Sequence, residues 1–259
     1  MFISKISGTK LDIIKECLLK YYLRYHEKLP GAPSKNEDAL NFGSYIHKIF
    51  EDGYKTTDKK KLYKLAEQHK KQYKISYSQI DRTKKCIENF YTRNMKFGRT
   101  VGCEYAFNVD LAEGIVLNGY IDRIIEGSEG GILILDYKTS KREKNKADLK
   151  FNRQLKNYCY AVHKDFNIPI SKIVCGHYYP LTDNLVTINY SRGEIATHVK
   201  NTVDTVWQIR KRKKSEFPAM QNQFCNWCEY KEICPAHGPA IMLKEAVQKH
   251  RIIKKAKPS

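Results

Sequence analysis

The spacing of apolar residues predicts helices at the start of the chain and strands in its centre. Apolar side chains recur at helical intervals in four stretches within the first hundred residues. These stretches are 10–25, 40–53, 58–74 and 78–96. Apolar and polar residues then alternate from Val101 to Val109, and two further apolar runs follow turn signals at 115–125 and 132–135. The centre of the chain is therefore predicted to form three consecutive strands.

The second half of the chain is predicted to continue with helices and strands in alternation. The predicted elements are a charged loop at 141–150, a helix at 151–165, strands at 172–179 and 185–190, a helix at 194–214 and a partly helical basic tail at 244–259. This order predicts an α/β (α+β) fold, in which helices flank a central mixed sheet. We expect an N-terminal helical region (1–100), a core (101–192) and a C-terminal segment (193–259), all within one compact domain.

The composition points to a polyanionic partner. The chain carries 47 Lys and Arg against 28 Asp and Glu, for a formal net charge of +19. Such self-repulsion is tolerated most easily when a polyanion neutralises it, and nucleic acid is the first candidate. An anionic membrane surface would need a basic amphipathic helix with an aromatic face, which the sequence lacks. A solvated lysine-rich surface without a partner is the alternative.

Several segment types are missing from the sequence. No run approaches the roughly 18 apolar residues of a membrane helix, and the N-terminus lacks the pattern of a signal peptide. We therefore expect an intracellular, cytoplasmic protein without a membrane partner. Neither the GxxxxGK[ST] phosphate loop nor the GxGxxG motif occurs, so helicase, ATPase and dinucleotide-binding functions have no support.

Two acids and a lysine form the candidate catalytic group. Asp136 and Lys138 lie two residues apart on the third predicted strand, so both side chains point to the same side of the sheet. Asp122 lies on the preceding strand, which can return antiparallel and bring the two carboxylates together. Mg²⁺ and Mn²⁺ prefer such oxygen ligands, and a nearby ammonium can stabilise charge that develops on phosphorus. The group suits metal-dependent phosphodiester hydrolysis, although Asp and Lys at a strand end are also common surface residues.

With these residues in place, the sequence resembles the PD-(D/E)XK nuclease superfamily, in particular its RecB-like exonuclease branch, which includes the CRISPR-associated iron-sulfur exonucleases. The resemblance runs from Cys17 to Cys234 and implies a restriction-endonuclease-like core. It implies that His47, Asp122 and Asp136 bind the metal, that the Tyr137 carbonyl is a further ligand, and that Lys138 assists the attacking water. It also implies roles in the active site for the Q-x-x-x-Y residues Gln154 and Tyr158.

Some of these residues have simpler explanations. Gln154 and Tyr158 share one helix face, which can be an ordinary half-buried surface. His47 can be a partly buried histidine with satisfied hydrogen bonds. Glu104 is a further candidate for the site, or a solvent-facing edge residue. Ile121 stands where the superfamily's name-giving motif has proline, a position that varies in this branch.

Three cysteines near the C-terminus form a ligand-like motif. Cys225, Cys228 and Cys234 follow the spacing C-x₂-C-x₅-C, and a four-cysteine site needs one more thiol. The resemblance implies that Cys17 supplies it and that the four bind a [4Fe-4S] cluster as a structural clasp. Cys₄ ligation also suits Zn²⁺, which stays the alternative. The other cysteines are predicted to be buried small hydrophobes, namely Cys86, Cys103, Cys159 and Cys175.

The basic segments and the 18 tyrosines suit contacts with phosphates and unpaired bases. Basic residues are dense at 141–150, 210–214 and 244–257. Without a sequence-reading motif, we expect binding to DNA that is single-stranded or has free ends, without sequence specificity. The expected function is a metal-dependent DNA exonuclease in repair, recombination, or CRISPR-type or phage DNA processing, with protein partners in a DNA-processing complex. The alternative is a non-catalytic nucleic-acid-binding subunit of such a complex.

Overall fold

The computed structural model describes residues 3–33 and 36–256, which divide into two compact units. The first unit joins Met1–Glu37 to Asp204–Ser259, and the second is Asp38–Val203. The predicted boundaries at residues 100 and 192 both fall inside the second unit, and the prediction of one compact domain stays a prediction. The end of the predicted basic tail, residues 257–259, lies outside the described residues.

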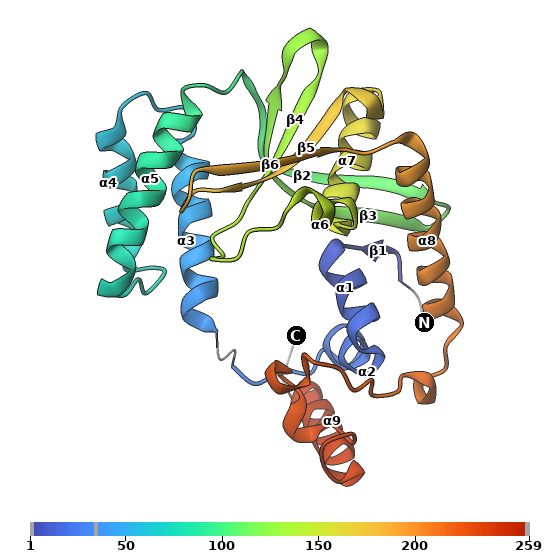
Figure 1. The fold of residues 1–259 in the computed structure, drawn as a ribbon. Helices are drawn as coiled ribbons and strands as arrows, with labels where there is room; N and C mark the ends of the chain where they lie inside the picture. Colours follow the sequence, from blue (N-terminus) through green and yellow to red (C-terminus); the bar gives the residue numbers. More distant parts are fainter. Residues whose placement is uncertain (1–2, 34–35, 257–259) are drawn as a thin grey trace. The chain divides into compact units, whose positions relative to one another are not determined.

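A mixed sheet forms the centre of the second unit (Figure 1). Its strands are β2 (Thr100–Ala112), β3 (Ile115–Glu126), β4 (Ile132–Tyr137), β5 (Ile173–Tyr179) and β6 (Asn184–Asn189). Neighbouring strands in this order are antiparallel, except that β4 and β5 run parallel. The parallel pair needs a crossover, and helices α6 (Lys146–Lys150) and α7 (Arg153–Phe166) lie in it. The predicted α/β fold with a central mixed sheet is confirmed.

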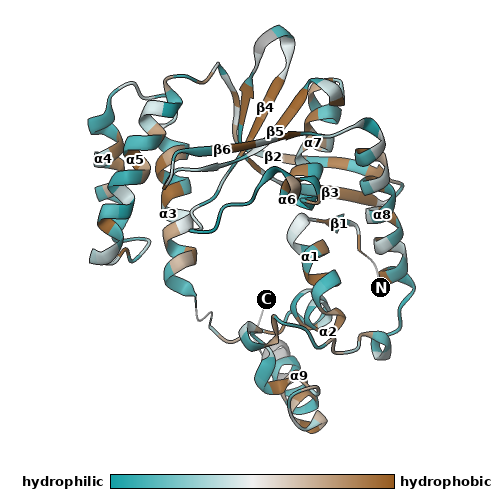
Figure 2. Ribbon diagram, viewed as in Figure 1, coloured by the Kyte–Doolittle hydropathy of each residue, from teal (hydrophilic) through white to brown (hydrophobic). Residues whose placement is uncertain are grey.

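Three helices pack against one side of this sheet. They are α3 (Glu37–Gly53), α4 (Lys59–Lys70) and α5 (Ile80–Asn94), and Figure 2 shows their mixture of apolar and polar positions. Their apolar side chains form one buried cluster with Leu135 and Tyr137 of β4 and Tyr178 of β5. At its centre, the rings of Phe50 and Phe90 are stacked 3.8 Å apart. The amphipathic pattern in the sequence therefore has its physical origin in this shared core.

Helix α7 packs against β2, β4 and β5, and its N-terminus is capped by a side chain. Asn152 accepts the backbone N–H of Leu155 and satisfies one of the free donors of the first turn. The preceding segment was predicted to be a loop, and this prediction is wrong for 146–150. There Asn145 and Asp148 form a reciprocal capping box, which stabilises the short helix α6.

The first unit is built from the two ends of the chain and from short elements. They are strand β1 (Lys5–Ile6), helices α1 (Gly8–Glu16) and α2 (Leu18–Tyr21), the π-helix Tyr22–His26, and helix α9 (Ala240–Ala256). Helix α8 (Arg192–Lys211) crosses from the second unit into the first. The 3₁₀ turns of the chain are Tyr77–Gln79, Ser128–Gly130, Ile170–Lys172, Lys214–Glu216, Cys225–Trp227 and Lys231–Ile233.

The predicted continuous helix over 10–25 is interrupted at Cys17. This residue has extended backbone angles (φ −162°, ψ 119°) and ends α1 before α2 begins. Because the helical ladder is broken there, the N–H of Leu19 donates instead to the carbonyl of Pro218 at 3.1 Å. The break matters because it places the Cys17 side chain at a helix junction.

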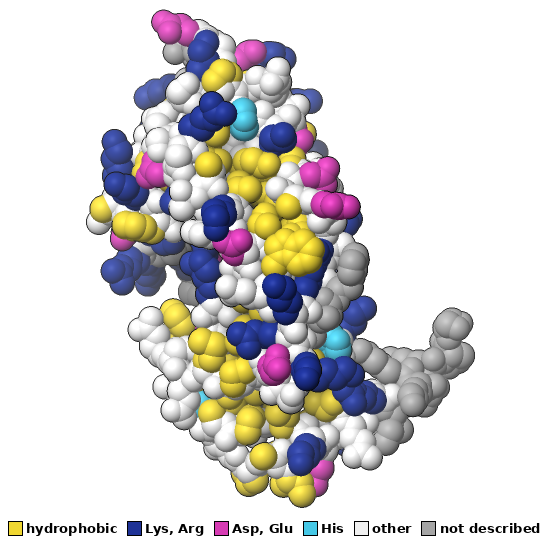
Figure 3. All heavy atoms as spheres, turned by 90° about the vertical axis from the view of Figure 1, so that its right-hand side faces the viewer, with side chains coloured by type: hydrophobic (Ala, Val, Ile, Leu, Met, Phe, Trp, Pro, Cys, Tyr) yellow, Lys and Arg dark blue, Asp and Glu magenta, His cyan; other side chains and the backbone are white. Residues whose placement is uncertain are grey.

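The described helices include none that combines the length and the apolar character needed to cross a membrane. Figure 3 shows that Lys and Arg side chains are spread over much of the face that it presents. This distribution agrees with the positive net charge of the sequence.

Replacing Phe50 with alanine should destabilise the protein by about 3–5 kcal/mol, because the substitution leaves a cavity in a fully buried aromatic stack. Guanidinium-induced unfolding followed by circular dichroism measures the change. Leu40→Ala on the same helix is the control, since that side chain is 60% exposed and should change stability by less than about 0.5 kcal/mol. Equal losses in the two variants would contradict the assigned core.

Candidate active site

The strand register brings three ionisable side chains into one row. Arg123 pairs with Leu135 across the antiparallel strands β3 and β4, so Asp122 lies opposite Asp136. In the parallel pair of β4 and β5, Asp136 is in register with His177. Leu135 and Tyr137, on either side of Asp136, point into the core of α3–α5. Because successive side chains of a strand point to opposite faces, the row of Asp122, Asp136 and His177 lies on the other face of the sheet, where α7 begins.

Glu104 extends this row onto strand β2. The residues on either side of it pair with Arg123 and Ile121, which places Glu104 opposite Asp122. Its φ of 45° lies in the left-handed region, which is strained for a residue with a side chain. Burial, together with the charge of Asp122, raises the pKa of Glu104 to about 7. The structure therefore places Glu104 inside β2 and opposite Asp122, at the candidate site.

His47 reaches the row from helix α3. Its Nε2 donates to the carbonyl oxygen of Tyr137 at 3.0 Å, and its Nδ1 lies 3.6 Å from Asp122 Oδ1. Burial alone would lower the pKa of His47, but the carboxylates of Asp122 and Asp136 outweigh it and raise the pKa to about 9. One ligand atom from each of His47, Glu104 and Asp122 lies within 4.8 Å of the others, a spacing that can hold a metal ion.

Lys138 connects the acids to helix α7. Its Nζ lies 2.5 Å from Asp136 Oδ2 and donates to the Gln154 side-chain oxygen at 3.2 Å. The Gln154 side-chain nitrogen donates in turn to the Tyr158 hydroxyl at 2.7 Å. Burial would lower the pKa of Lys138, but the Asp136 carboxylate more than compensates and raises it. The structure thus links Gln154 directly to the lysine, and Tyr158 to the lysine through Gln154.

Asp136 is the most deeply buried of the acids, with 1% of its surface exposed. Its Oδ2 is shielded from solvent, and the Lys138 ammonium at 2.5 Å and His177 Nε2 at 3.4 Å approach it. Burial raises the pKa of Asp136 despite the attraction of Lys138, and the charge of Asp122 raises it further. The converging carboxylates and the imidazole of His47 fit a hard divalent cation.

A cleft of about 470 Å³ opens beside these ligands. Ser44, Lys48 and Glu51 of α3 line it together with His47 and Glu104. Solvent and substrate can therefore reach the imidazole and the outer carboxylate, whereas Asp136 stays covered.

His177 is the site residue that the sequence did not indicate. It is completely buried, and its Nε2 lies 3.4 Å from Asp136 Oδ2. Burial lowers its pKa to about 3, helped by the charges of Lys138 and Lys144, so the imidazole is neutral. A histidine inside the apolar strand Ile173–Tyr179 was the available signal.

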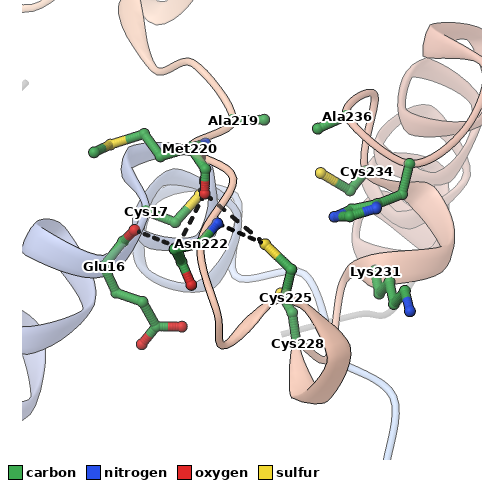
Figure 4. Close-up of a pocket in the computed structure, with 11 residues that line it drawn as sticks. Glu16, Cys17, Ala219, Met220, Asn222, Cys225, Cys228, Lys231, Cys234 and Ala236 are labelled. Atoms are coloured by element: carbon green, nitrogen blue, oxygen red, sulfur yellow. Dashed lines mark hydrogen bonds between the residues drawn. The ribbon is translucent and has the colours of Figure 1, made fainter.

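The cysteines of the C-x₂-C-x₅-C motif and Cys17 line one pocket within the first unit (Figure 4). Cys17 comes from the junction of α1 and α2, and Cys225, Cys228 and Cys234 come from the turns before α9. The N–H of Met220 donates to Cys17 Sγ at 3.5 Å, and the N–H of Asn222 donates to Cys225 Sγ at 3.3 Å. A backbone N–H therefore lies beside the sulfur of Cys17 and beside that of Cys225.

The second unit holds the candidate group of close metal-ligand atoms. Within the part of the chain that the structure describes, only His47, Glu104 and Asp122 form a group of three such ligand atoms within 4.8 Å. The predicted burial of the other cysteines holds for Cys86, Cys159 and Cys175, whereas Cys103 is only half-buried on β2.

The fold and the row of acids beside Lys138 define a protein of the nuclease class. The family model described as PD-(D/E)XK nuclease superfamily matches residues 5–235, and the chain belongs to this superfamily. The resemblance drawn from His47, Asp122, Asp136 and Lys138 is therefore confirmed at the level of the family.

Among curated proteins, the chain is similar to a subunit of the ATP-dependent helicase/deoxyribonuclease of Streptococcus uberis, with 24% identity over 176 residues that cover 61% of this chain and 16% of the relative. The corresponding protein of Streptococcus pyogenes is 24% identical over 152 residues, covering 52% and 14%. The chain thus spans about a sixth of the length of these relatives. The crystal structure of SSO0001 matches 92% of this chain and 89% of that chain, with 19% identity and a TM-score of 0.43.

Replacing Glu104 with glutamine should stabilise the metal-free protein at neutral and alkaline pH. Folding raises the pKa of Glu104 from 4.5 to about 7, so the wild-type protein loses stability as the pH rises between these values, and the loss persists above them. The glutamine variant lacks this loss. Thermal unfolding in EDTA from pH 4.5 to 8 should show a stability difference that grows with pH.

Glu113→Gln, in the exposed turn between β2 and β3, is the matched control for removal of a carboxylate. Equal stability of wild-type protein and the Glu104 variant at pH 8 would show that Glu104 is not held in an unfavourable environment.

Proposed function

We propose that the protein is a metal-dependent DNA exonuclease that hydrolyses phosphodiester bonds. The observation that carries the proposal is the position of the Lys138 ammonium, 2.5 Å from a buried Asp136 carboxylate that lies opposite Asp122. This pairing of acids with an amine suits hydrolysis at a phosphate, because it offers cation ligands and a hydrogen-bond donor at one point.

The resident cation would be Mg²⁺ or Mn²⁺, held by His47, Asp122 and Asp136, with the Tyr137 carbonyl as a further ligand and Glu104 as an additional one. The donor set supports this assignment, since carboxylate and carbonyl oxygens are the ligands that these ions prefer. When bound, the ion supplies positive charge for the phosphate and a more acidic water molecule.

Lys138 would orient the attacking water and stabilise negative charge on the phosphate oxygens. Its ammonium has three donors, two of which point toward Asp136 and Gln154. Gln154 of α7 holds the lysine and is itself held by Tyr158, so the part of this pair would be to position the lysine and the strand of DNA. Because the Tyr158 ring is buried, its hydroxyl gives the Gln154 side chain a fixed hydrogen-bond partner.

The surface supports DNA as the substrate. The net charge is +19, and the exposed residues Lys141, Arg142, Lys144 and Lys146 directly follow the catalytic strand. Such contacts are salt-sensitive and independent of sequence, which suits single-stranded DNA or free ends. The relatives are named as deoxyribonuclease subunits, which supports DNA as the substrate and a protein partner in a DNA-processing complex such as one for repair or recombination.

The cysteine pocket would hold a [4Fe-4S] cluster that clasps the α1–α2 junction to the C-terminal segment. A single zinc ion needs four sulfurs at about 2.3 Å from one point. The four cysteines line one pocket, which supports a group that all four ligate. The backbone N–H groups of Met220 and Asn222 donate to Cys17 and Cys225, and a ligating sulfur can accept such bonds.

Asp136→Ala and Lys138→Ala should each reduce hydrolysis by roughly 10²–10³-fold, because each removes a group that acts on the phosphate or the cation. Purified protein, Mn²⁺ and end-labelled single-stranded DNA provide the assay. Lys84→Ala, which removes an exposed lysine of α5, is the matched control and should leave the rate unchanged. Full activity in both site variants would refute the assignment, and gel-shift binding by the wild-type protein without any cleavage would favour the non-catalytic subunit.

Anaerobically purified protein should be brown, with broad visible absorbance and bound iron. Cys234→Ser should lose the colour and most of the iron, because it removes a proposed ligand, whereas Cys103→Ser should keep both, because Cys103 lies on β2 of the other unit. A colourless protein that contains one equivalent of zinc would contradict the cluster and support the zinc alternative.

A further inference from the structure

Arg123 of β3 carries a positive charge into the interior of the second unit, with 2% of its surface exposed. It pairs with Leu135 of β4 and therefore faces the core of α3–α5, on the opposite side of the sheet from Asp122. Its Nε donates to Thr100 Oγ1 at 2.9 Å, and its Nη1 donates to Asn94 Oδ1 at 2.6 Å. Both of these acceptors are neutral, so the hydrogen bonds supply no negative charge.

Two aromatic rings compensate part of this buried charge. The guanidinium carbon of Arg123 lies 5.5 Å from the centre of the Tyr54 ring and 5.3 Å from that of the Phe97 ring. Such contacts stabilise a cation by less than its removal from water costs, which is why buried charges are normally paired with an opposite charge. A guanidinium also has more N–H donors than the two that Thr100 and Asn94 engage. Arg123 is therefore suited to bind an anion.

A cleft of about 380 Å³ opens at this guanidinium. It is lined by the segment 54–57 after α3, by residues of the segment 94–100 after α5, and by Arg123 itself. Among the described residues that line it, none is acidic. The exposed Lys55 adds a second positive charge, and its Nζ lies 5.5 Å from the centre of the same Tyr54 ring. Two cations thus approach one ring beside an open cleft, which favours an anion there.

Hydrogen bonds and a close backbone contact hold the walls of this cleft. The Asn94 side-chain nitrogen donates to the carbonyl of Tyr54 at 2.9 Å, which joins the end of α5 to the end of α3 and leaves Oδ1 for Arg123. Gly98 lets the loop before β2 lie against β3, because a Cβ at this position would collide with the carbonyl oxygen of Glu126. The donors are therefore in place before a ligand arrives, which lowers the cost of binding it.

We propose that this cleft is a phosphate-binding site, with Arg123 as its anchor and Lys55 as a second cation. Phosphate fits because its oxygens match the N–H donors of a guanidinium and also accept from an ammonium. The Thr100 hydroxyl accepts from Arg123 and can donate its own proton to the same ligand. The phosphate group belongs either to a DNA strand, a source that rests on the proposed function, or to a free nucleotide, a source that does not.

Isothermal titration of metal-free protein in EDTA tests the site without any hydrolysis. The probes are inorganic phosphate, thymidine monophosphate and a short single-stranded oligonucleotide. Arg123→Gln should weaken binding by roughly 10–100-fold, because it removes a charged donor from a buried position. Lys55→Ala should weaken it by roughly 3-fold, since the ammonium is exposed. Lys60→Ala is the matched control, because it removes an exposed lysine of α4 that does not line the cleft.

The pattern over the probes identifies the source of the phosphate. For a DNA strand, the loss extends to the oligonucleotide, and each lost contact lowers the slope of log Kd against log salt by about 0.7. For a free nucleotide, the loss is confined to phosphate and the monophosphate. Equal affinities of wild-type protein, Arg123→Gln and Lys55→Ala for all three probes would overturn the proposal. Failure of the proposed function would appear differently, as wild-type protein that binds these probes but cleaves no DNA with Mn²⁺.

The side-chain ¹⁵N signals of wild-type protein test the anchor even if Arg123→Gln fails to fold. Titration with inorganic phosphate should shift the guanidinium signals of Arg123. Those of Arg93 should stay in place, because that guanidinium already pairs with Asp183 at 2.9 Å. An Arg123 signal that does not move as phosphate is added would overturn the proposal.

Discussion

The site depends on the pairing register of β3, β4 and β5. Because side chains alternate along a strand, a slip of one residue in β4 would turn Asp136 and Lys138 into the core of α3–α5. Apolar residues on the same strands oppose such a slip, since Ile124 and Ile134 face each other and are both fully buried. The hydrophobic core therefore determines the distance between the two central carboxylates.

This register carries an electrostatic cost. Three acids converge here, and burial raises the pKa values of two of them, Glu104 and Asp136. The positive φ of Glu104 adds backbone strain in the same place. The clustered carboxylates and the strained backbone do not stabilise the fold. A bound cation would relieve the repulsion between the carboxylates directly. Lys138 and His47 compensate part of it in the metal-free protein.

Most of the fold and the central acids could be predicted from the sequence, for physical reasons. A short turn joins β3 to β4, so local spacing predicts that Asp122 meets Asp136, and strand alternation places Lys138 beside them. His177 could not be found in this way, because its register with β4 is set by a long crossover through α6 and α7. The helix break at Cys17 could not be predicted for a similar reason. The carbonyl that accepts the N–H of Leu19 beside the break belongs to Pro218, which is distant in sequence.

The central claim is that the acids of β3 and β4 hold a divalent cation. Anomalous scattering from crystals grown with Mn²⁺ tests it most directly. The account predicts a peak between Asp122 and Asp136, within coordination distance of His47 and the Tyr137 carbonyl. A site without a peak in crystals that bind Mn²⁺ elsewhere, or with these carboxylates turned away from the ion, would contradict it.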